Sequence, residues 1–163
     1  MEESPIVKRE PSTTRDYEIS EDIARIDWKR VHEWLASSYW TPGIPLERVR
    51  RGGENSALVL GAYKNGEQVG YLRVVSDKTR FAYLCDVWVE EKHRGKGLAR
   101  RMVQRALSHP DFETVNWLLA TLDAHGVYAK LGFTPLSNPE RWMSKGKFCT
   151  AKQGEPGSLN FNA

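Results

Sequence analysis

Hydrophobic and polar positions between residues 56 and 107 follow the spacing of strands first and of a helix last. The segments 56–63, 68–75 and 81–89 are rich in β-branched and aromatic residues, which predicts three strands. Asn65 and Gly66 form the signal of a type I′ hairpin, so we expect an antiparallel meander. Apolar residues then recur at spacings of three and four, which predicts an amphipathic helix: they are Ala99, Met102, Val103, Ala106 and Leu107.

Weaker patterns on both sides predict the rest of one α/β domain. A parallel strand should follow the helix, because a strand, a helix and a second strand form a crossover unit. Asp123 is expected to cap a helix that Gly132 ends. The further expected elements are a short strand at Tyr17 and Ile19, helices over 26–38, 45–51 and 124–131, a strand over 115–120, and strands starting at Phe133 and covering 141–143.

Residues 84–107 join a buried strand, a glycine-containing turn and the start of the helix. Gly95 and Gly97 let a ligand approach the backbone, because neither has a Cβ. Unpaired N–H groups at a helix N-terminus attract anions, phosphates among them. The interpretation is a phosphate site; a tight turn before a solvated basic helix is the alternative. Four cations crowd this helix start, where a bound anion would offset their repulsion by the helix dipole: Arg94, Lys96, Arg100 and Arg101.

The residues of the turn exclude two phosphate-binding motifs and match a third. A Walker loop needs four residues between its first glycine and Gly-Lys-Ser/Thr, and this spacing is absent. A dinucleotide-binding fingerprint would need a glycine at Arg100. Arg94, Gly97 and Ala99 instead resemble the Arg/Gln-x-x-Gly-x-Gly/Ala signature of the GNAT acyltransferase superfamily. In that family the loop binds the pyrophosphate of acetyl-coenzyme A.

A second segment carries the same resemblance. Tyr128, Gly132 and Phe133 stand in a stretch similar to the Tyr-x-Lys-x-Gly-Phe ending that GNAT proteins carry downstream. The resemblance covers 54–133 well and the rest loosely. It implies a single α/β domain over 15–145, with a mixed sheet (an antiparallel meander, then a parallel pair) flanked by helices. Residues 1–14 and 146–163 are expected to be terminal tails.

Composition and charge narrow the class of protein. The 163 residues suffice for one domain, and a net charge of +3 suits an anionic ligand without requiring nucleic acid. No apolar run approaches the ~20 residues of a membrane span, and the first residues show no apolar core of a signal peptide, so we expect a cytoplasmic protein. Cys85 and Cys149 lie far apart and the histidines lack ligand spacing, so neither a disulfide framework nor a metal site is expected.

The resemblance implies a donor site in which acetyl-coenzyme A is the acyl donor substrate. The backbone of Val87 and Val89 is expected to pair with its pantetheine amides, where the parallel strands splay apart. Asp123 stands near the place where many members carry Asn; because it cannot donate a hydrogen bond as Asn does, its contact to the donor should differ. The other expected donor-site residues are Arg94, Gly95, Lys96, Gly97, Leu98 and Ala99.

Tyr128 and Asp86 are the candidates for the chemistry of transfer. Tyr128 matches the position from which a tyrosine often protonates the leaving thiolate in this family; a phenol of pKa ~10 can donate to a thiolate of pKa ~8.5 when a hydrogen bond aligns them. A packing role is the alternative. Asp86 needs water or a partner, because an unpaired buried carboxylate is costly. It could accept the proton of the amine, or pair with Arg73 and organise the sheet. We expect it to share a sheet face with Leu84 and Trp88.

The acceptor site is the least specified part of the chain. Tyr39 and Trp40 could line its mouth, or Trp40 could simply pack on the sheet. Asp86 and the Tyr39 ring would suit a cationic amine. His125, one helical turn before Tyr128, could orient the phenol or be an exposed histidine.

The sequence therefore predicts an acetyl-CoA-dependent N-acetyltransferase that acts on a primary amine, with a small molecule as the expected acceptor. Direct attack in a ternary complex is expected, because Cys85 is a poor nucleophile candidate in a buried strand. The resemblance also allows a homodimer. Two alternatives stay open: a non-catalytic acyl-CoA-binding sensor with this fold and, less favoured, a nucleic-acid-binding module that uses the basic helix and the tryptophans.

Overall fold

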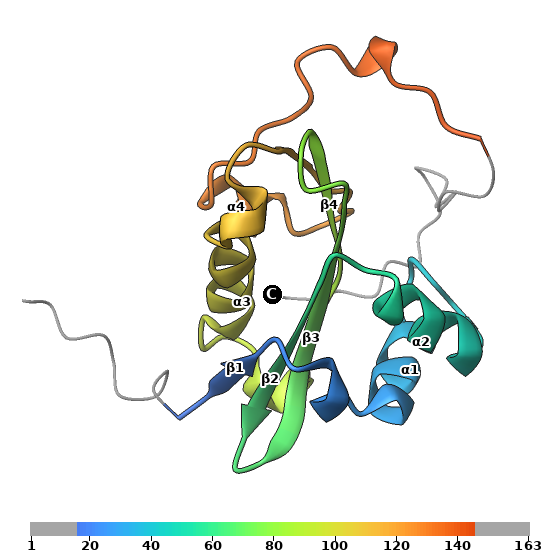
Figure 1. The fold of residues 1–163 in the computed structure, drawn as a ribbon, viewed down its shortest axis with the longest axis vertical. Coiled ribbons are helices and arrows are strands. Elements are labelled where there is room, and N and C mark those ends of the chain that lie inside the picture. Colours follow the sequence, from blue (N-terminus) through green and yellow to red (C-terminus); the bar gives the residue numbers. More distant parts are fainter. Residues whose placement is uncertain (1–15, 146–163) are drawn as a thin grey trace, which may run out of the picture.

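The structure, a computed structural model, describes residues 16–145, which form a five-stranded mixed sheet with helices on both faces (Figure 1). The strand order is β1-β2-β3-β4-β5, so neighbours in sequence are neighbours in the sheet. The first four strands are antiparallel and β5 is parallel to β4, which confirms the predicted meander and parallel pair. The expected tails lie outside the described residues. The strands are β1 (Glu18–Ser20), β2 (Leu58–Lys64), β3 (Glu67–Ser76), β4 (Phe81–Val89) and β5 (Asn116–Leu118).

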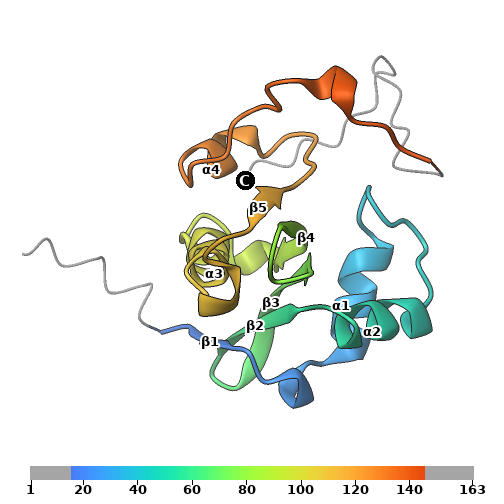
Figure 2. The ribbon, with the colours of Figure 1, turned by 45° about the horizontal axis from the view of Figure 1, so that its top comes forward.

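Helices α1 and α2 lie together on one face of the sheet and α3 lies on the other (Figures 1 and 2). The short helix α4 follows β5 and packs its inner residues against the α3 side. The helices are α1 (Trp28–Ala36), α2 (Leu46–Glu54), α3 (Leu98–Leu107) and α4 (His125–Ala129), with 3₁₀ turns at Ile23–Arg25, Glu91–His93, Pro110–Phe112 and Pro139–Arg141.

Each face of the sheet has its own hydrophobic cluster. The apolar stripe of α3 is confirmed, because its inward positions pack on β2, β3 and β4. This first cluster includes Leu60, Leu72, Leu84, Leu98, Met102, Val103 and Ala106. The second cluster lies under α1 and α2 and includes Val31, Trp34, Leu35, Val49, Val59 and Tyr71.

Local signals explain where several elements begin and end. The first helix begins at Trp28, later than expected, because the Asp27 carboxylate accepts a hydrogen bond from Arg30 N at 3.1 Å and caps it. Asn65 and Gly66 have φ of 51° and 82°, as a type I′ turn requires. The second helix runs past the predicted end at residue 51 to Glu54.

Two expectations for the C-terminal part are wrong. Within 133–145 the structure contains no strand, and this segment runs beyond α4, outside the sheet (Figures 1 and 2). Pro135 and Pro139 lack the N–H that a strand ladder needs.

Asp123 does not cap α4: the cap residue is Ala124, whose N–H donates to Thr121 Oγ1 at 3.1 Å. Gly132 does follow the helix in a left-handed conformation, with φ of 92°.

The contact of α2 with α1 generates a prediction about Gly53. A Cβ on Gly53 would lie 2.3 Å from Trp28 Cη2 and 3.1 Å from the Tyr71 hydroxyl oxygen. We expect Gly53→Ala to lower the free energy of unfolding by about 1–3 kcal/mol through overpacking, as measured by urea denaturation. Gly126→Ala in α4 is the matched control, because its Cβ would meet nothing within 4 Å; its stability should stay or rise. Equal effects of both changes would contradict this packing.

Candidate functional site

The parallel pair β4–β5 is short, which leaves most of one edge of β4 open. β5 pairs only with the first three residues of β4, up to Tyr83 opposite Leu118. Beyond that point β4 continues to Val89 without a strand partner on this edge among the described residues. An extended ligand could hydrogen-bond to backbone groups here, although the Val89 carbonyl already accepts from Arg94 Nε at 2.8 Å. The predicted contact residues Val87 and Val89 lie in this open stretch.

A β-bulge interrupts β4 within the open stretch. Tyr71 lies opposite Trp88 and Arg73 opposite Cys85, so two residues of β4 face one residue of β3. One of the two is Asp86, which has a φ of +55°. Aspartate adopts this left-handed region more readily than most residues do.

The bulge changes which side chains share a face. Leu84 packs in the cluster under α3, whereas Trp88 packs against the cluster under α1 and α2. The expectation that Asp86 shares a face with both residues is therefore wrong. The extra residue reverses the alternation, so Asp86 lies on the α1 and α2 side together with Trp88.

Asp86 has a partner on each carboxylate oxygen. Its Oδ2 accepts from Arg73 Nε at 2.5 Å, and its Oδ1 accepts from Trp40 Nε1 at 3.1 Å. The Asp86 side chain is 8% exposed, so the ion pair is largely removed from water. Arg73 also donates from Nη1 to Ser56 Oγ at 3.3 Å, which ties the bulge to the start of β2. Arg73, the partner that could organise the sheet with Asp86, is thus in place. Trp40 packs on the sheet and also donates a hydrogen bond to the carboxylate.

The glycine loop leads from β4 to the N-terminus of α3. Gly95 and Gly97 have φ of 70° and 73°, and a Cβ on either would meet nothing within 4 Å. Gly97 is the N-cap residue, and among the described residues no side chain caps this helix. Leu98 is 2% exposed and anchors the first turn in the core. Backbone N–H groups of the first turn therefore face a space that an anion can approach.

The basic side chains of the loop and the turn before it make different contacts. Arg94 stacks its guanidinium over the Trp88 ring at 5.2 Å, besides its bond to β4. Lys96 Nζ donates to the carbonyl of Lys92 at 3.2 Å and stays exposed. The buried His93 accepts or donates through Nδ1 to the Tyr17 hydroxyl at 2.9 Å, which fastens the loop to the N-terminal edge of the sheet. Burial, with Lys92 nearby, lowers the pKa of His93.

Tyr128 lies half-buried in α4, where its ring contacts the Phe133 ring edge-on at 5.9 Å. Burial raises the pKa of Tyr128 to about 12, with smaller contributions from Tyr39 and Asp123. The Tyr39 hydroxyl accepts from Leu122 N at 3.1 Å, so the α1–α2 connection reaches the segment before α4.

The structure thus brings three of the predicted residues into contact in series, and Tyr39 also contacts the segment before the helix that carries Tyr128. Tyr39 contacts Trp40 edge-on at 4.9 Å, Trp40 holds Asp86, and Tyr39 acts electrostatically on Tyr128. Asp123 and His125 are exposed at the start of α4. Sequence reasoning missed Trp88 as the ring between Arg94 and Trp40. Trp88 can be identified only from its contacts in the structure, because in the sequence it occupies an ordinary position of a strand.

Cys85 is a thiol, not a thiolate, at neutral pH. Burial raises the pKa of Cys85 to about 12, and its Sγ lies 3.8 Å from the Arg73 carbonyl, to which it donates. The described residues contain no group of three His, Cys, Asp or Glu side chains placed to hold a metal ion. In the same part of the chain, no helix has the length and apolar character to cross a membrane.

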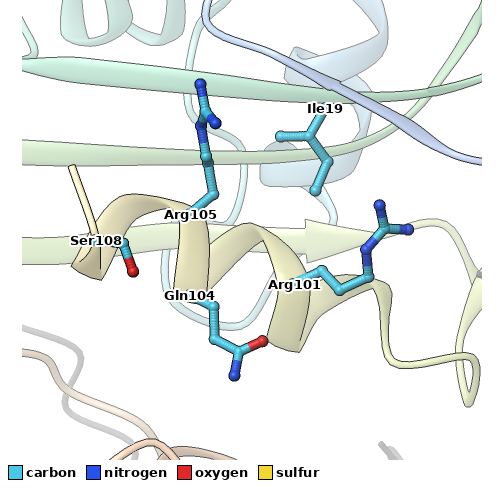
Figure 3. A pocket seen from close by; sticks show the side chains of 5 residues that line it. All are labelled: Ile19, Arg101, Gln104, Arg105 and Ser108. Carbon is cyan, nitrogen blue, oxygen red and sulfur yellow. The ribbon is translucent and has the colours of Figure 1, made fainter. Parts of the chain in front are cut away.

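A separate depression lies on the outer side of α3, next to β1 (Figure 3). Arg105 on its wall is paired with Glu21 at 2.9 Å. Of the four cations expected at the phosphate site, only Arg101 lines this depression, and none of the predicted donor-contact or catalytic residues does. Its lining residues are Ile19, Arg101, Gln104, Arg105 and Ser108.

Comparisons with known proteins agree with this geometry. The model of the acetyltransferase (GNAT) family matches residues 17–133. A crystal structure of a candidate GNAT acetyltransferase from Xanthomonas campestris pv. campestris is 36% identical, with a TM-score of 0.79 over 83% of this chain and 96% of that chain. A candidate acetyltransferase of Gibberella zeae is 29% identical over 119 residues, 61% of this chain and 67% of that protein.

A more distant structure shares the fold. It is a predicted acetyltransferase of Clostridium acetobutylicum with acetyl-CoA, 17% identical, with a TM-score of 0.60 over 80% of this chain and 94% of that chain. At this identity the likeness shows the fold alone. The family model, in contrast, matches well over half of the chain. This chain therefore belongs to the GNAT acetyltransferase family.

Proposed function

We propose that the protein is an acetyl-CoA-dependent N-acetyltransferase that transfers the acetyl group to a primary amine by direct attack in a ternary complex. The observation that carries this proposal is the open edge of β4 leading into an uncapped helix N-terminus. The first can pair with the amides of a pantetheine arm and the second can bind a pyrophosphate.

Acetyl-CoA would lie along residues that bind it through their backbone N–H and C=O groups rather than through their side chains. Val87 and Val89 present the strand edge, and Gly95, Gly97 and the first turn of α3 present N–H groups. Lys96 is exposed beside them and can neutralise phosphate charge. Acetyl-CoA supplies the thioester, whereas residues of the chain bind the donor, accept the proton of the amine and stabilise the leaving thiolate.

A calorimetric titration with acetyl-CoA tests the donor site. We expect micromolar binding that Gly97→Trp abolishes, because the indole would fill the space in front of the α3 N-terminus. Gly66→Trp is the matched control: Gly66 has a φ of +82°, so it carries the same backbone strain, but it lies in the β2–β3 hairpin. Absence of binding by the unmodified protein, or equal loss in both variants, would overturn the donor site.

Tyr128 is proposed to donate to the leaving thiolate. With a pKa of about 12 the phenol keeps its proton at physiological pH and is always ready to donate. Complete transfer to a thiolate of pKa ~8.5 is uphill, so the phenol acts through a hydrogen bond that strengthens as charge develops on sulfur. The thiolate finally takes a proton from water, and this proton balances the one that the attacking amine releases to Asp86.

Replacing Tyr128 by Phe should lower kcat by about 10²-fold, a typical share for an acid catalyst, while the Kd for acetyl-CoA stays within about twofold. Tyr63→Phe is the control, because this remote hydroxyl also makes a hydrogen bond, to Arg25 O at 3.0 Å. In the unmodified enzyme, ionisation of Tyr128 should not reduce kcat below about pH 11, since its pKa is about 12. Full activity of the Phe variant would favour a packing role and reopen the sensor alternative.

Asp86 is proposed to take the proton of the attacking amine, directly or through water. Each carboxylate oxygen can accept more than one hydrogen bond, so the contacts with Arg73 and Trp40 leave capacity for another donor. The buried ion pair also fixes where the carboxylate points.

Asp86→Asn should lower both stability and kcat. The Arg73 guanidinium would lose its partner, which costs about 3 kcal/mol of unfolding free energy, the lower end for a buried pair, because Arg73 keeps some contact with water. Asn also tolerates the left-handed backbone at this position. Arg73→Met breaks the same pair but keeps the carboxylate, so it should lose similar stability and retain most of kcat. Equal losses of kcat would leave Asp86 with a purely structural role.

A further inference from the structure

We propose that the acceptor is a monoamine with an aromatic body, an arylalkylamine, whose ring lies against Tyr39 and Trp40. This inference rests on the proposed acetyltransferase function and names the substrate class of the same site. It depends on three observations: a run of rings, the position of that run beside Tyr128, and the charge that remains there.

The rings form a continuous series from α1 through β4 to the α1–α2 connection. Trp34 stacks on Trp88 with centroids 6.4 Å apart, Trp88 contacts Trp40 at 6.0 Å, and Trp40 contacts Tyr39 at 4.9 Å. Trp34 is buried, whereas Tyr39 is 36% exposed and Trp40 is partly exposed. The series therefore ends in accessible aromatic surface, on which another ring can stack or pack edge-on.

This accessible end lies beside the proposed chemistry. The Tyr39 hydroxyl accepts from Leu122 N, and Tyr39 contributes to the raised pKa of Tyr128. Trp40 donates to Asp86, the proposed proton acceptor. A substrate that presents its nitrogen to Asp86 therefore places its body next to Trp40 and Tyr39.

The charge at Asp86 does not favour an acceptor with several ammonium groups. Asp86 is already neutralised by Arg73, so it does not attract a second cation as an unpaired carboxylate would. The acidic group that acts on Tyr128 is the exposed Asp123, not Asp86. The further ammonium groups of a polyamine would therefore gain little from Asp86, whereas a neutral aromatic body gains contact with the rings.

The test compares amines of matched reach by thiol release from acetyl-CoA. We expect kcat/KM for 2-phenylethylamine to exceed those for hexylamine and spermidine by about 10-fold or more. Tyr39→Leu should reduce the preference for phenylethylamine over hexylamine toward unity, while Tyr39→Phe, which keeps the ring, should preserve it. Trp142→Leu removes an exposed tryptophan outside this set and should change neither amine.

Three results would overturn the aromatic acceptor. These are a kcat/KM for hexylamine or spermidine equal to or above that for phenylethylamine, no turnover of any aromatic amine in the panel, and an unchanged preference in Tyr39→Leu. The calorimetric titration with acetyl-CoA separates this failure from that of the proposed function. Donor binding together with preferred acetylation of spermidine would keep the acetyltransferase and reject the aromatic acceptor, whereas absence of donor binding would reject both.

Discussion

The ion pair between Asp86 and Arg73 holds the centre of the molecule in place. It fixes a bulge at which β4 leaves its regular pairing, and it does so where one backbone residue has a left-handed conformation. Trp40 brings the α1–α2 connection to the same carboxylate, and Ser56 brings the start of β2 to the same guanidinium. A buried charge requires its partner, so these contacts specify one arrangement even where an apolar pair could be equally stable.

Under the proposed function, the two sides of the bulge would recognise their ligands by different means. On the donor side, the strand edge and the glycine loop offer backbone groups, which exist whatever the side chains are. On the proposed acceptor side, recognition would fall to the side chains of Tyr39, Trp40 and their neighbours. Substitutions on the second side can therefore change the acceptor without disturbing the first.

Elements whose signals are local could be predicted from the sequence. The hairpin at Asn65 and Gly66, the stripe of α3 and the glycine loop each depend on neighbouring residues, and the structure confirms them. The face on which Leu84 lies could not be predicted, because one inserted residue in β4 reverses the alternation and leaves no trace in composition.

The same limit applies to the site and to the C-terminal part. An ion pair of Asp86 with Arg73 was one of the alternatives that the sequence offered. Only the register of β3 on β4 shows that the two side chains meet. The central position of Trp88 among the rings could not be predicted either, because it depends on how α1 packs on the sheet. The strands expected after Phe133 were wrong because short apolar signals outweighed Pro135 and Pro139, which remove ladder donors.

The short pairing of β4 with β5 has a thermodynamic consequence for the segment that follows. From Glu113 to Lys145 no described residue is fully buried, and three residue pairs join β5 to the sheet. Such a segment can detach at low free energy while β1–β4 stay folded. Detachment would expose the Tyr128 phenol and return its pKa from about 12 toward its usual value. Ionisation of Tyr128 and local unfolding are therefore coupled, so that alkali lowers the free energy needed to detach this segment.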